Sequence, residues 1–232
     1  MNKYKIFFLP YAGASAAAYA SWKKYLNHKA DVYPVELKGR GRRFNESFYE
    51  NMEEAVEDVF KIVSREIGEN KYVIYGHSMG TILAYELNRR IRKEKLKEPE
   101  HIFLSGRNSP GTFSPLKDIH LLNDDDFALK IAELGGTSKE VFENYELRSI
   151  FLPIMKADFK IVDSYVFNND FKLRCGITVI NGKQDKMVSY ENTRKWEGLT
   201  EGDCKYFEFD GDHFFINDYK KEISQIINDT LY

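Results

Sequence analysis

The sequence has little cysteine, no long apolar run and almost no net charge, and each shortage excludes a class of protein. Its two cysteines, Cys175 and Cys204, cannot build a disulfide framework, and no Cys/His cluster has the spacing of a zinc site. No segment approaches the roughly 18 consecutive apolar residues that a transmembrane helix needs. With 34 Lys and Arg against 36 Asp and Glu, the net charge is −2, which argues against a dedicated nucleic-acid binder. The chain also lacks G-x-G-x-x-G and Walker A motifs, so nothing supports dinucleotide or nucleoside triphosphate chemistry.

The N-terminal region resembles a secretory signal peptide only in part. Residues 6–22 carry no charge and end in alanine-rich sequence. Their strongly apolar part spans only residues 6–9 before Pro10 and Gly13 interrupt it, whereas a signal peptide needs about 7–15 apolar residues. Together with the scarcity of cysteine, this predicts a cytoplasmic protein. A secreted hydrolase is the alternative, and cleavage would then remove the first strand.

Short apolar runs alternate with helical patterns along the chain, which is typical of an α/β fold. Strands are predicted at residues 5–9, 31–37, 71–75, 101–105, 177–181 and 204–209, and Pro34 places the second at a sheet edge. Helices are predicted at residues 15–26, 51–68, 83–91 and from 216 to the end. This order predicts a mostly parallel central sheet flanked by helices. Residues 111–171 show helical character without a clear strand, so we expect a helical lid inserted into one domain of residues 1–232.

A G-x-S-x-G motif at residues 76–80 marks a candidate nucleophile. It follows a predicted strand and opens a predicted helix, which is the setting of a nucleophile elbow. Turning from strand to helix in so few residues strains the backbone at Ser78, and the flanking Gly76 and Gly80 let neighbouring backbone pass closely. The hydroxyl of Ser78 would then stand at a helix N-terminus, where the dipole favours a developing negative charge.

A serine hydroxyl needs a base, and the sheet topology selects one of the five histidines. His213 follows the last predicted strand, so it falls on the same carboxyl edge of the sheet as Ser78. Asp185 follows the strand before it and is the favoured carboxylate for orienting His213, with Asp210 or Asp212 as alternatives. The sequence therefore predicts a Ser-Asp-His triad in α/β-hydrolase order.

An oxyanion hole requires two backbone N–H donors. One is expected from Met79, the residue after the nucleophile. The other is expected from the loop after the first strand, where Ala12 is favoured and Tyr11 is the alternative.

Six short segments spread over most of the chain resemble one family. They are residues 8–13 (FLPYAG), 39–42 (GRGR), 76–80 (GHSMG), 152–159 (LPIMKADF), 182–185 (GKQD) and 211–215 (GDHFF). Together they resemble type II thioesterases, the editing enzymes that accompany nonribosomal peptide and polyketide synthases. The chain departs from that pattern at Ala14, where a second Gly is usual, at Lys38, where a Pro is usual, and at Lys156, which replaces an Arg.

The resemblance implies a serine thioesterase of the α/β-hydrolase superfamily. Its substrates would be acyl groups held as thioesters on the phosphopantetheine arm of acyl or peptidyl carrier proteins. No cofactor of its own, no nucleic acid and no membrane would be involved, and we expect a monomer. Hydrolysis would remove aberrant or stalled acyl groups so that the synthase can restart.

Two further groups of residues are candidates for recognition. The only local basic feature, at residues 38–43, offers Arg40, Arg42 and Arg43 for docking an acidic carrier domain, although such a charge run is more often a solvated loop. Aromatic residues make up 15% of the chain, and many fall in the expected lid. We expect some of them to line an acyl chamber, with Tyr11, Phe151 and Phe214 as candidates.

The resemblance leaves several functions open. A medium-chain acyl-carrier thioesterase and a general esterase or lipase share the fold and the triad, and function depends on the site rather than on the fold. A non-catalytic carrier-binding module is an alternative from another class, against which a complete triad argues.

Overall fold

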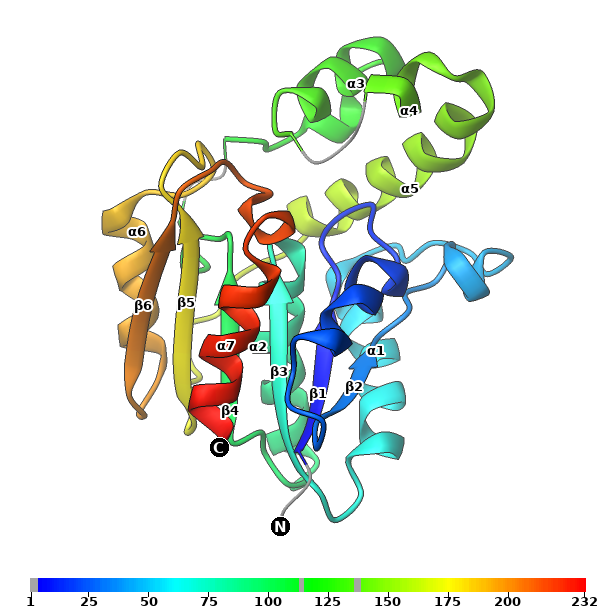
Figure 1. The fold of residues 1–232 in the computed structure, drawn as a ribbon. Coiled ribbons are helices and arrows are strands. Elements are labelled where there is room, and N and C mark those ends of the chain that lie inside the picture. The colour runs from blue at the N-terminus through cyan, green and yellow to red at the C-terminus, as the bar shows by residue number, and fades with distance from the viewer. Residues whose placement is uncertain (1–3, 113–114, 136–138) are drawn as a thin grey trace.

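A six-stranded parallel sheet forms the centre of the computed structural model, which describes residues 4–112, 115–135 and 139–232 (Figure 1). The strands lie in the order β2-β1-β3-β4-β5-β6, and every neighbouring pair is parallel. Their bounds are β1 (Tyr4–Leu9), β2 (Asp31–Pro34), β3 (Lys71–His77), β4 (His101–Ser105), β5 (Gly176–Gly182) and β6 (Cys204–Phe209). The parallel α/β architecture expected from the alternating pattern is confirmed.

Helices cover both faces of the sheet because successive strand residues point to opposite sides. On one face, Phe7 and Ile74 pack with α1 (Met52–Ile67) and α2 (Met79–Lys93). On the other face, Phe8 and its neighbours pack with the 3₁₀ helix η1 (Ala16–Lys24) and with α7 (Lys220–Leu231). Each strand of the centre is therefore buried on both sides, which explains its nearly continuous apolar sequence.

Local signals set most of the element boundaries. The side chain of Asn51 accepts a hydrogen bond from the backbone N–H of Glu54 (2.9 Å) and caps the start of α1, and Gly68 caps its end after Ile67. Strand β2 lies at the sheet edge, as predicted, but it ends at Pro34 rather than at residue 37, because proline has no N–H for the ladder.

Two predicted helices differ from the structure. Residues 15–26 were expected to form an α-helix, but they form the tighter helix η1, capped by the side chain of Ser15. The last helix was expected to begin at residue 216, but a short 3₁₀ turn, η5 (Phe215–Asn217), precedes α7. Both 3₁₀ segments are held by i→i+3 hydrogen bonds. The spacing of apolar residues alone does not distinguish this pattern from the i→i+4 hydrogen bonds of an α-helix.

The segment between β4 and β5 contains helices and lies above the carboxyl ends of the strands (Figure 1). It holds η3 (Ile119–Leu121), α3 (Asp124–Ala132), α4 (Lys139–Glu143) and α5 (Tyr145–Asp163). These helices have a small apolar core of their own, centred on the buried Phe127 and Leu152. They occupy the part of the chain in which we expect the lid, and they are called the lid helices below. No helix in the described ranges is long and apolar enough to cross a membrane.

The rest of the described elements complete the edges. Helices α6 (Tyr190–Arg194) and η4 (Lys195–Leu199) link β5 to β6, and the short η2 (Gly41–Arg43) follows β2. Aromatic residues also form groups outside the lid helices. On the face of the sheet that η1 covers, Phe8, Tyr19, Trp22 and Tyr75 pack edge to face or tilted, with ring centroids no more than 6.0 Å apart.

Two glycines set how closely α2 approaches the sheet. A Cβ at Gly76, in β3, would collide with the backbone of Gly80, in α2. A Cβ at Gly80 would collide with the carbonyl oxygen of Leu9 at the end of β1. Both collisions are with backbone, which cannot turn away as a side chain can, so the strand-to-helix turn requires glycine at both positions.

Replacing Gly80 with alanine should therefore lower the free energy of unfolding by about 1–3 kcal/mol, because the added methyl group overpacks backbone against backbone. Chemical denaturation measures the change. Gly198, which is exposed and has no atom within 4 Å of an added Cβ, provides the matched control. A Gly80→Ala variant as stable as Gly198→Ala would refute the close approach.

Candidate active site

Ser78 occupies a strained turn between β3 and α2. Its φ of 53° and ψ of −113° lie in a region that non-glycine residues rarely adopt. Two hydrogen bonds hold this backbone: the N–H of Ser78 donates to the carbonyl of Ser105 (2.8 Å), and the hydroxyl of Thr81 donates to the carbonyl of Ser78 (2.8 Å). Strain that the surroundings maintain in this way is typical of functional sites.

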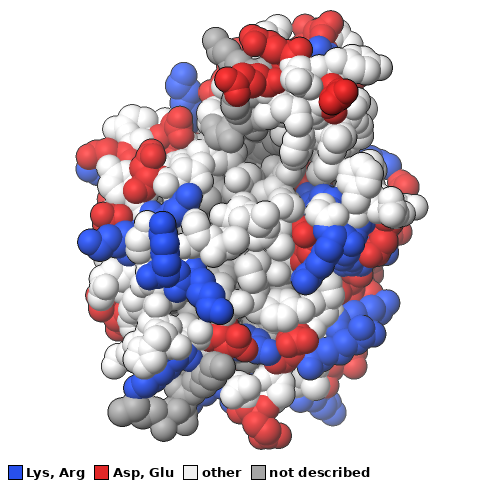
Figure 2. All heavy atoms as spheres, turned by 45° about the vertical axis from the view of Figure 1, so that its right-hand side comes forward, with Lys and Arg blue, Asp and Glu red and all other residues white. Residues whose placement is uncertain are grey.

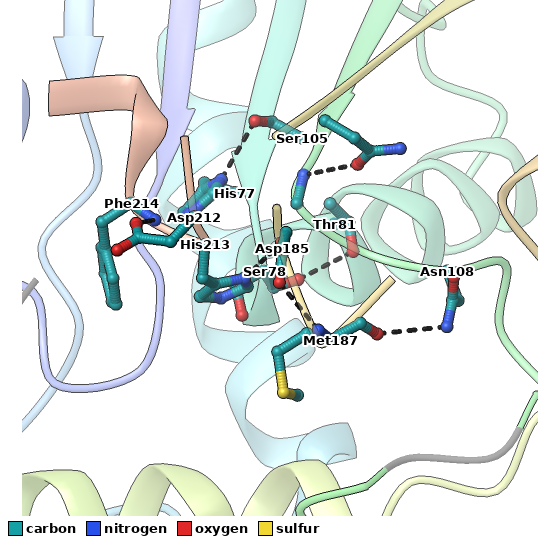
Figure 3. Close-up of polar contacts among 12 residues, drawn as sticks. His77, Ser78, Thr81, Ser105, Asn108, Asp185, Met187, Asp212, His213 and Phe214 are labelled. Carbon is teal, nitrogen blue, oxygen red and sulfur yellow. Dashed lines mark hydrogen bonds and ion pairs between the residues drawn. The ribbon is translucent and has the colours of Figure 1, made fainter. Parts of the chain in front are cut away.

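His213 and Asp185 form a buried hydrogen-bonded pair beside Ser78 (Figure 3). Nδ1 of His213 lies 2.7 Å from Oδ2 of Asp185, and both residues are only 5% exposed. The other carboxylate oxygen of Asp185 accepts the backbone N–H of Met187 (2.8 Å), which fixes the orientation of the carboxylate. With Nδ1 engaged, Nε2 is the ring nitrogen left to exchange a proton with a hydroxyl.

The alternative carboxylates have other partners. Asp210 is paired with Lys183 at the surface (2.9 Å). Asp212 accepts the backbone N–H of Phe214 (2.8 Å). Of the three carboxylates considered from the sequence, Asp185 is the one that contacts His213.

A second histidine lies behind the site. His77 is fully buried, and its Nδ1 lies 3.0 Å from the hydroxyl of Ser105. Its ring centroid is 5.0 Å from that of His213. Burial, with a smaller effect from the nearby His213, holds the pKa of His77 well below its usual range, so His77 stays neutral. A neutral ring at this position adds no positive charge next to His213.

Ser78 and His213 line one narrow pocket of about 40 Å³ beneath the lid helices. Its floor includes four residues predicted from the sequence: Tyr11, Ala12, Met79 and Phe214. Apolar side chains of the lid segment form most of its roof: Leu116, Ile131, Leu134, Met155, Phe159 and Val162. The charged Arg107 and Asp163 line it as well.

Phe151 does not line this pocket, contrary to the expectation from the sequence. It packs against the apolar core of the lid helices instead. Phe159, two helical turns further along α5, is the aromatic residue of that helix that reaches the pocket. The aromatic content of the sequence indicated the lid. Which of its phenylalanines lines the pocket depends on the direction of each side chain on the folded helix, which the sequence does not show.

Two backbone N–H groups are placed to receive an oxyanion in this pocket. Met79 begins α2, so its N–H has no acceptor within the helix. The N–H of Ala12, in the loop after β1, donates to no protein acceptor in the described part of the chain. Because both residues line the pocket with Ser78, they can converge on a carbonyl oxygen bound there.

A buried ion pair fixes the loop that carries Ala12. The guanidinium of Arg40 makes a two-pronged contact with the carboxylate of Asp158 in α5 (2.5 and 2.7 Å). Oδ2 of Asp158 also accepts the backbone N–H of Gly13 (2.7 Å), and Arg40 donates to the carbonyl of Ala14 (3.4 Å). Burial acts to lower the pKa of Arg40, but the charge and hydrogen bonds of Asp158, together with nearby Tyr49 and Glu36, outweigh it and raise the pKa, so the guanidinium stays charged.

This geometry corrects the docking role expected for the basic loop. Arg40 is only 2% exposed and cannot meet a partner. Arg43 is largely occupied by two carboxylates, those of Glu46 and Asp58 (2.6–3.0 Å). Arg42 is exposed and has no ion pair among the described residues, so it is the one arginine of the three that is free to contact a partner.

Sequence reasoning missed the role of Asp158. Its segment, residues 152–159, was one of those that carried the family resemblance, so the signal was present. The partner could not be read from it, because Arg40 lies 118 residues away.

Comparisons with known proteins identify the family of this chain. The thioesterase domain family matches residues 4–231. The gramicidin S biosynthesis protein GrsT of Aneurinibacillus migulanus is 34% identical over 225 residues, which cover 97% of this chain and 88% of that protein. The crystal structure of ClbQ, from the colibactin NRPS/PKS pathway, has a TM-score of 0.94 at 33% identity and covers 100% of this chain and 97% of its own. The type II thioesterase BorB, from the borrelidin biosynthetic cluster, has a TM-score of 0.90 at 30% identity, with 99% and 93% covered. The fold is accordingly that of the α/β-hydrolases.

The ion pair yields a test that separates stability from activity. Asp158→Ala should lower the free energy of unfolding by about 3–5 kcal/mol, because it leaves the Arg40 guanidinium buried and unpaired. The double variant Arg40→Met/Asp158→Leu should regain most of that stability with apolar packing. It should still lose activity by on the order of 10²-fold in kcat, because Gly13 has lost the acceptor that positions its loop. Denaturation curves and thioester turnover measure the two effects, and a stable double variant with full kcat would contradict the positioning role.

Proposed function

This chain belongs to the thioesterase family, and from that premise we propose the substrate it takes and the residues that act on it. It is a thioester hydrolase, and its relatives include type II thioesterases of NRPS/PKS pathways. We propose that its substrate is an acyl group held as a thioester on the phosphopantetheine arm of a carrier protein. Hydrolysis frees the arm from aberrant or stalled acyl groups.

The observation that carries the assignment of the residues is the buried His213–Asp185 pair in the pocket of Ser78. In the proposed reaction, Nε2 of His213 takes the proton of the Ser78 hydroxyl as its oxygen attacks the thioester carbonyl. Asp185 holds the ring by Nδ1 and stabilises the imidazolium that forms. The N–H groups of Met79 and Ala12 stabilise the oxyanion.

The second half of the reaction uses the same groups. The pantetheine thiolate leaves and takes a proton from His213, and an acyl ester remains on Ser78. Water then attacks this ester with His213 again as base, which releases the carboxylic acid and restores Ser78. None of these steps needs a cofactor.

The pocket favours a short acyl group. Its volume is only about 40 Å³, and the apolar side chains of its roof suit a short alkyl chain. This supports removal of short acyl groups over the release of medium-chain fatty acids. A general esterase remains the competing function, because the same residues attack oxygen esters.

We also propose how the partner meets the enzyme. Acidic side chains gather on the outer face of the lid helices, whereas Lys and Arg form separate groups on the body below it (Figure 2). A negatively charged carrier domain would be repelled by the former and attracted by the latter. Arg42 is the candidate contact in the loop after β2. Carrier domains of this kind are cytoplasmic, so we place the enzyme there, acting as a monomer.

Replacing Ser78 with alanine should reduce the hydrolysis of a butyryl thioester on a carrier protein by up to about 10⁶-fold, because no nucleophile remains. Release of butyrate measures the loss, and Ser64→Ala, a change on the outside of α1, should retain activity. The wild-type enzyme should prefer the carrier thioester to a butyryl oxygen ester. Retained hydrolysis by Ser78→Ala would sink the mechanism, and a preference for oxygen esters would favour the general esterase.

Phe159→Ala should shift the preference toward longer acyl groups, because it removes part of the pocket roof. Phe151→Ala is the matched control, since both phenylalanines are partly buried on α5 and only Phe159 lines the pocket. The measurement is kcat/KM across acetyl, butyryl, hexanoyl and octanoyl thioesters. If both variants keep the wild-type profile, the pocket does not select chain length.

A further inference from the structure

An arginine without a partner lies at the junction of two pockets. Arg107 follows β4 at the carboxyl edge of the sheet. It lines the narrow pocket described above, and it also lines a second pocket of about 420 Å³. Ser78 and His213 line both pockets as well, so Arg107 stands beside the point where they meet at the candidate nucleophile.

The guanidinium of Arg107 has its donors free. Its backbone carbonyl is anchored by the indole N–H of Trp196 (3.1 Å), but its side chain makes no hydrogen bond or ion pair with any described residue. Burial lowers the pKa of Arg107 to about 10, so the group remains charged at neutral pH. A guanidinium carries five N–H donors and no acceptor, and Arg107 is partly exposed where it lines the two pockets, so a ligand bound there can reach these donors. The side chain is therefore poised to receive an acceptor from a ligand.

The two pockets differ in character, which indicates which part of a thioester each one holds. The narrow pocket has an apolar roof and suits the acyl chain. The wider pocket has more polar side chains in its lining, among them Asn108, Ser109, Thr112 and Lys117, beside apolar ones such as Val162 and Phe167. A phosphopantetheine arm, which carries two amide groups and is joined to the carrier through its phosphate, matches the wider pocket in both size and polarity.

We propose that Arg107 binds the pantetheine arm by donating hydrogen bonds to the carbonyl oxygen of the amide closest to the thioester. This assignment rests on the proposed function. Two methylene groups and one nitrogen separate that carbonyl from the sulfur, so it lies beside the junction of the pockets when the thioester carbonyl is at Ser78. Arg107 would then recognise a feature present in every carrier-bound substrate, whatever its acyl group.

The charges around Arg107 favour this neutral acceptor over a carboxylate on the acyl group. Asp163 lines both pockets too, and its carboxylate is held by the backbone N–H of Asp118 (2.9 Å) and by Nδ1 of His120 (2.8 Å). It forms no ion pair with Arg107, yet its charge already balances that of the guanidinium across the pocket. A carboxylated acyl group would add a second negative charge near Asp163, whereas an amide oxygen would not.

The test compares two butyryl thioesters that differ in the amide alone. One is the thioester of N-acetylcysteamine, which keeps the first pantetheine amide, and the other is that of 1-pentanethiol, which has the same chain length without it. Arg107→Met should lower kcat/KM for the amide-containing thioester by about 10–100-fold, the range for a lost hydrogen bond to a charged group, and leave the other unchanged. The kcat/KM of Arg107→Lys for the amide-containing thioester should lie between those of the wild type and Arg107→Met, because lysine keeps the positive charge but lacks the planar set of guanidinium donors. Arg65→Met, at an exposed site on α1 outside both pockets, is the control.

Three results would overturn the proposal. An equal loss on both thioesters would mean that Arg107 supports the reaction centre or the fold. A loss confined to succinyl as opposed to butyryl substrates would place its ligand on the acyl side. The third comes from calorimetry, which measures equilibrium binding of pantetheine to the Ser78→Ala protein and does not depend on turnover. We expect the affinity for pantetheine to fall at least tenfold when Arg107→Met is added to Ser78→Ala. An unchanged affinity would contradict the assignment. Failure of the proposed function would appear separately, as a wild-type enzyme inactive toward carrier-bound butyrate.

Discussion

The buried ion pair between Arg40 and Asp158 holds the candidate active site together. It joins the loop after β2 to the lid helix α5, and through Oδ2 of Asp158 it also holds the N–H of Gly13 in the loop after β1. A buried ion pair of this kind adds little to the free energy of unfolding, because the cost of removing both charges from water offsets their mutual attraction. Removing one partner is strongly destabilising, because the other charge is then left buried and unpaired. Its main consequence is geometric. Since Ala12 adjoins Gly13, the position of the lid helix and that of the oxyanion loop are set by the same carboxylate.

The rest of the site follows from the topology of the sheet. Parallel strands bring the ends of β3, β5 and β6 to one edge, so Ser78, Asp185 and His213 meet although more than 100 residues separate the first from the others. The lid helices lie over this edge, and two pockets meet at Ser78: a narrow one with a largely apolar roof and a wider one with more polar side chains. That asymmetry fits a substrate with a short acyl chain on one side of its thioester and a polar arm on the other.

Much of the fold could be predicted from the sequence because its signals are local. The strand-to-helix turn at Ser78, the Asn51 cap and the edge position of Pro34 each depend on a few neighbouring residues. Arg40 was misjudged because charge in a loop sequence predicts exposure, and its partner Asp158 is distant in the chain. Phe151 was preferred to Phe159 because composition does not reveal side-chain direction, and Arg107 was overlooked because its significance lies in the partner it lacks.

The most direct test of Ser78 as the acyl acceptor is to capture the covalent intermediate. Rapid acid quenching after mixing the enzyme with butyryl-loaded carrier protein, followed by peptide mapping, locates the acyl group. We predict a butyryl ester on the peptide that contains residues 76–80, at Ser78, which disappears as butyrate is released. An adduct on another residue, or release of butyrate with no adduct on Ser78 at any time, would contradict the mechanism.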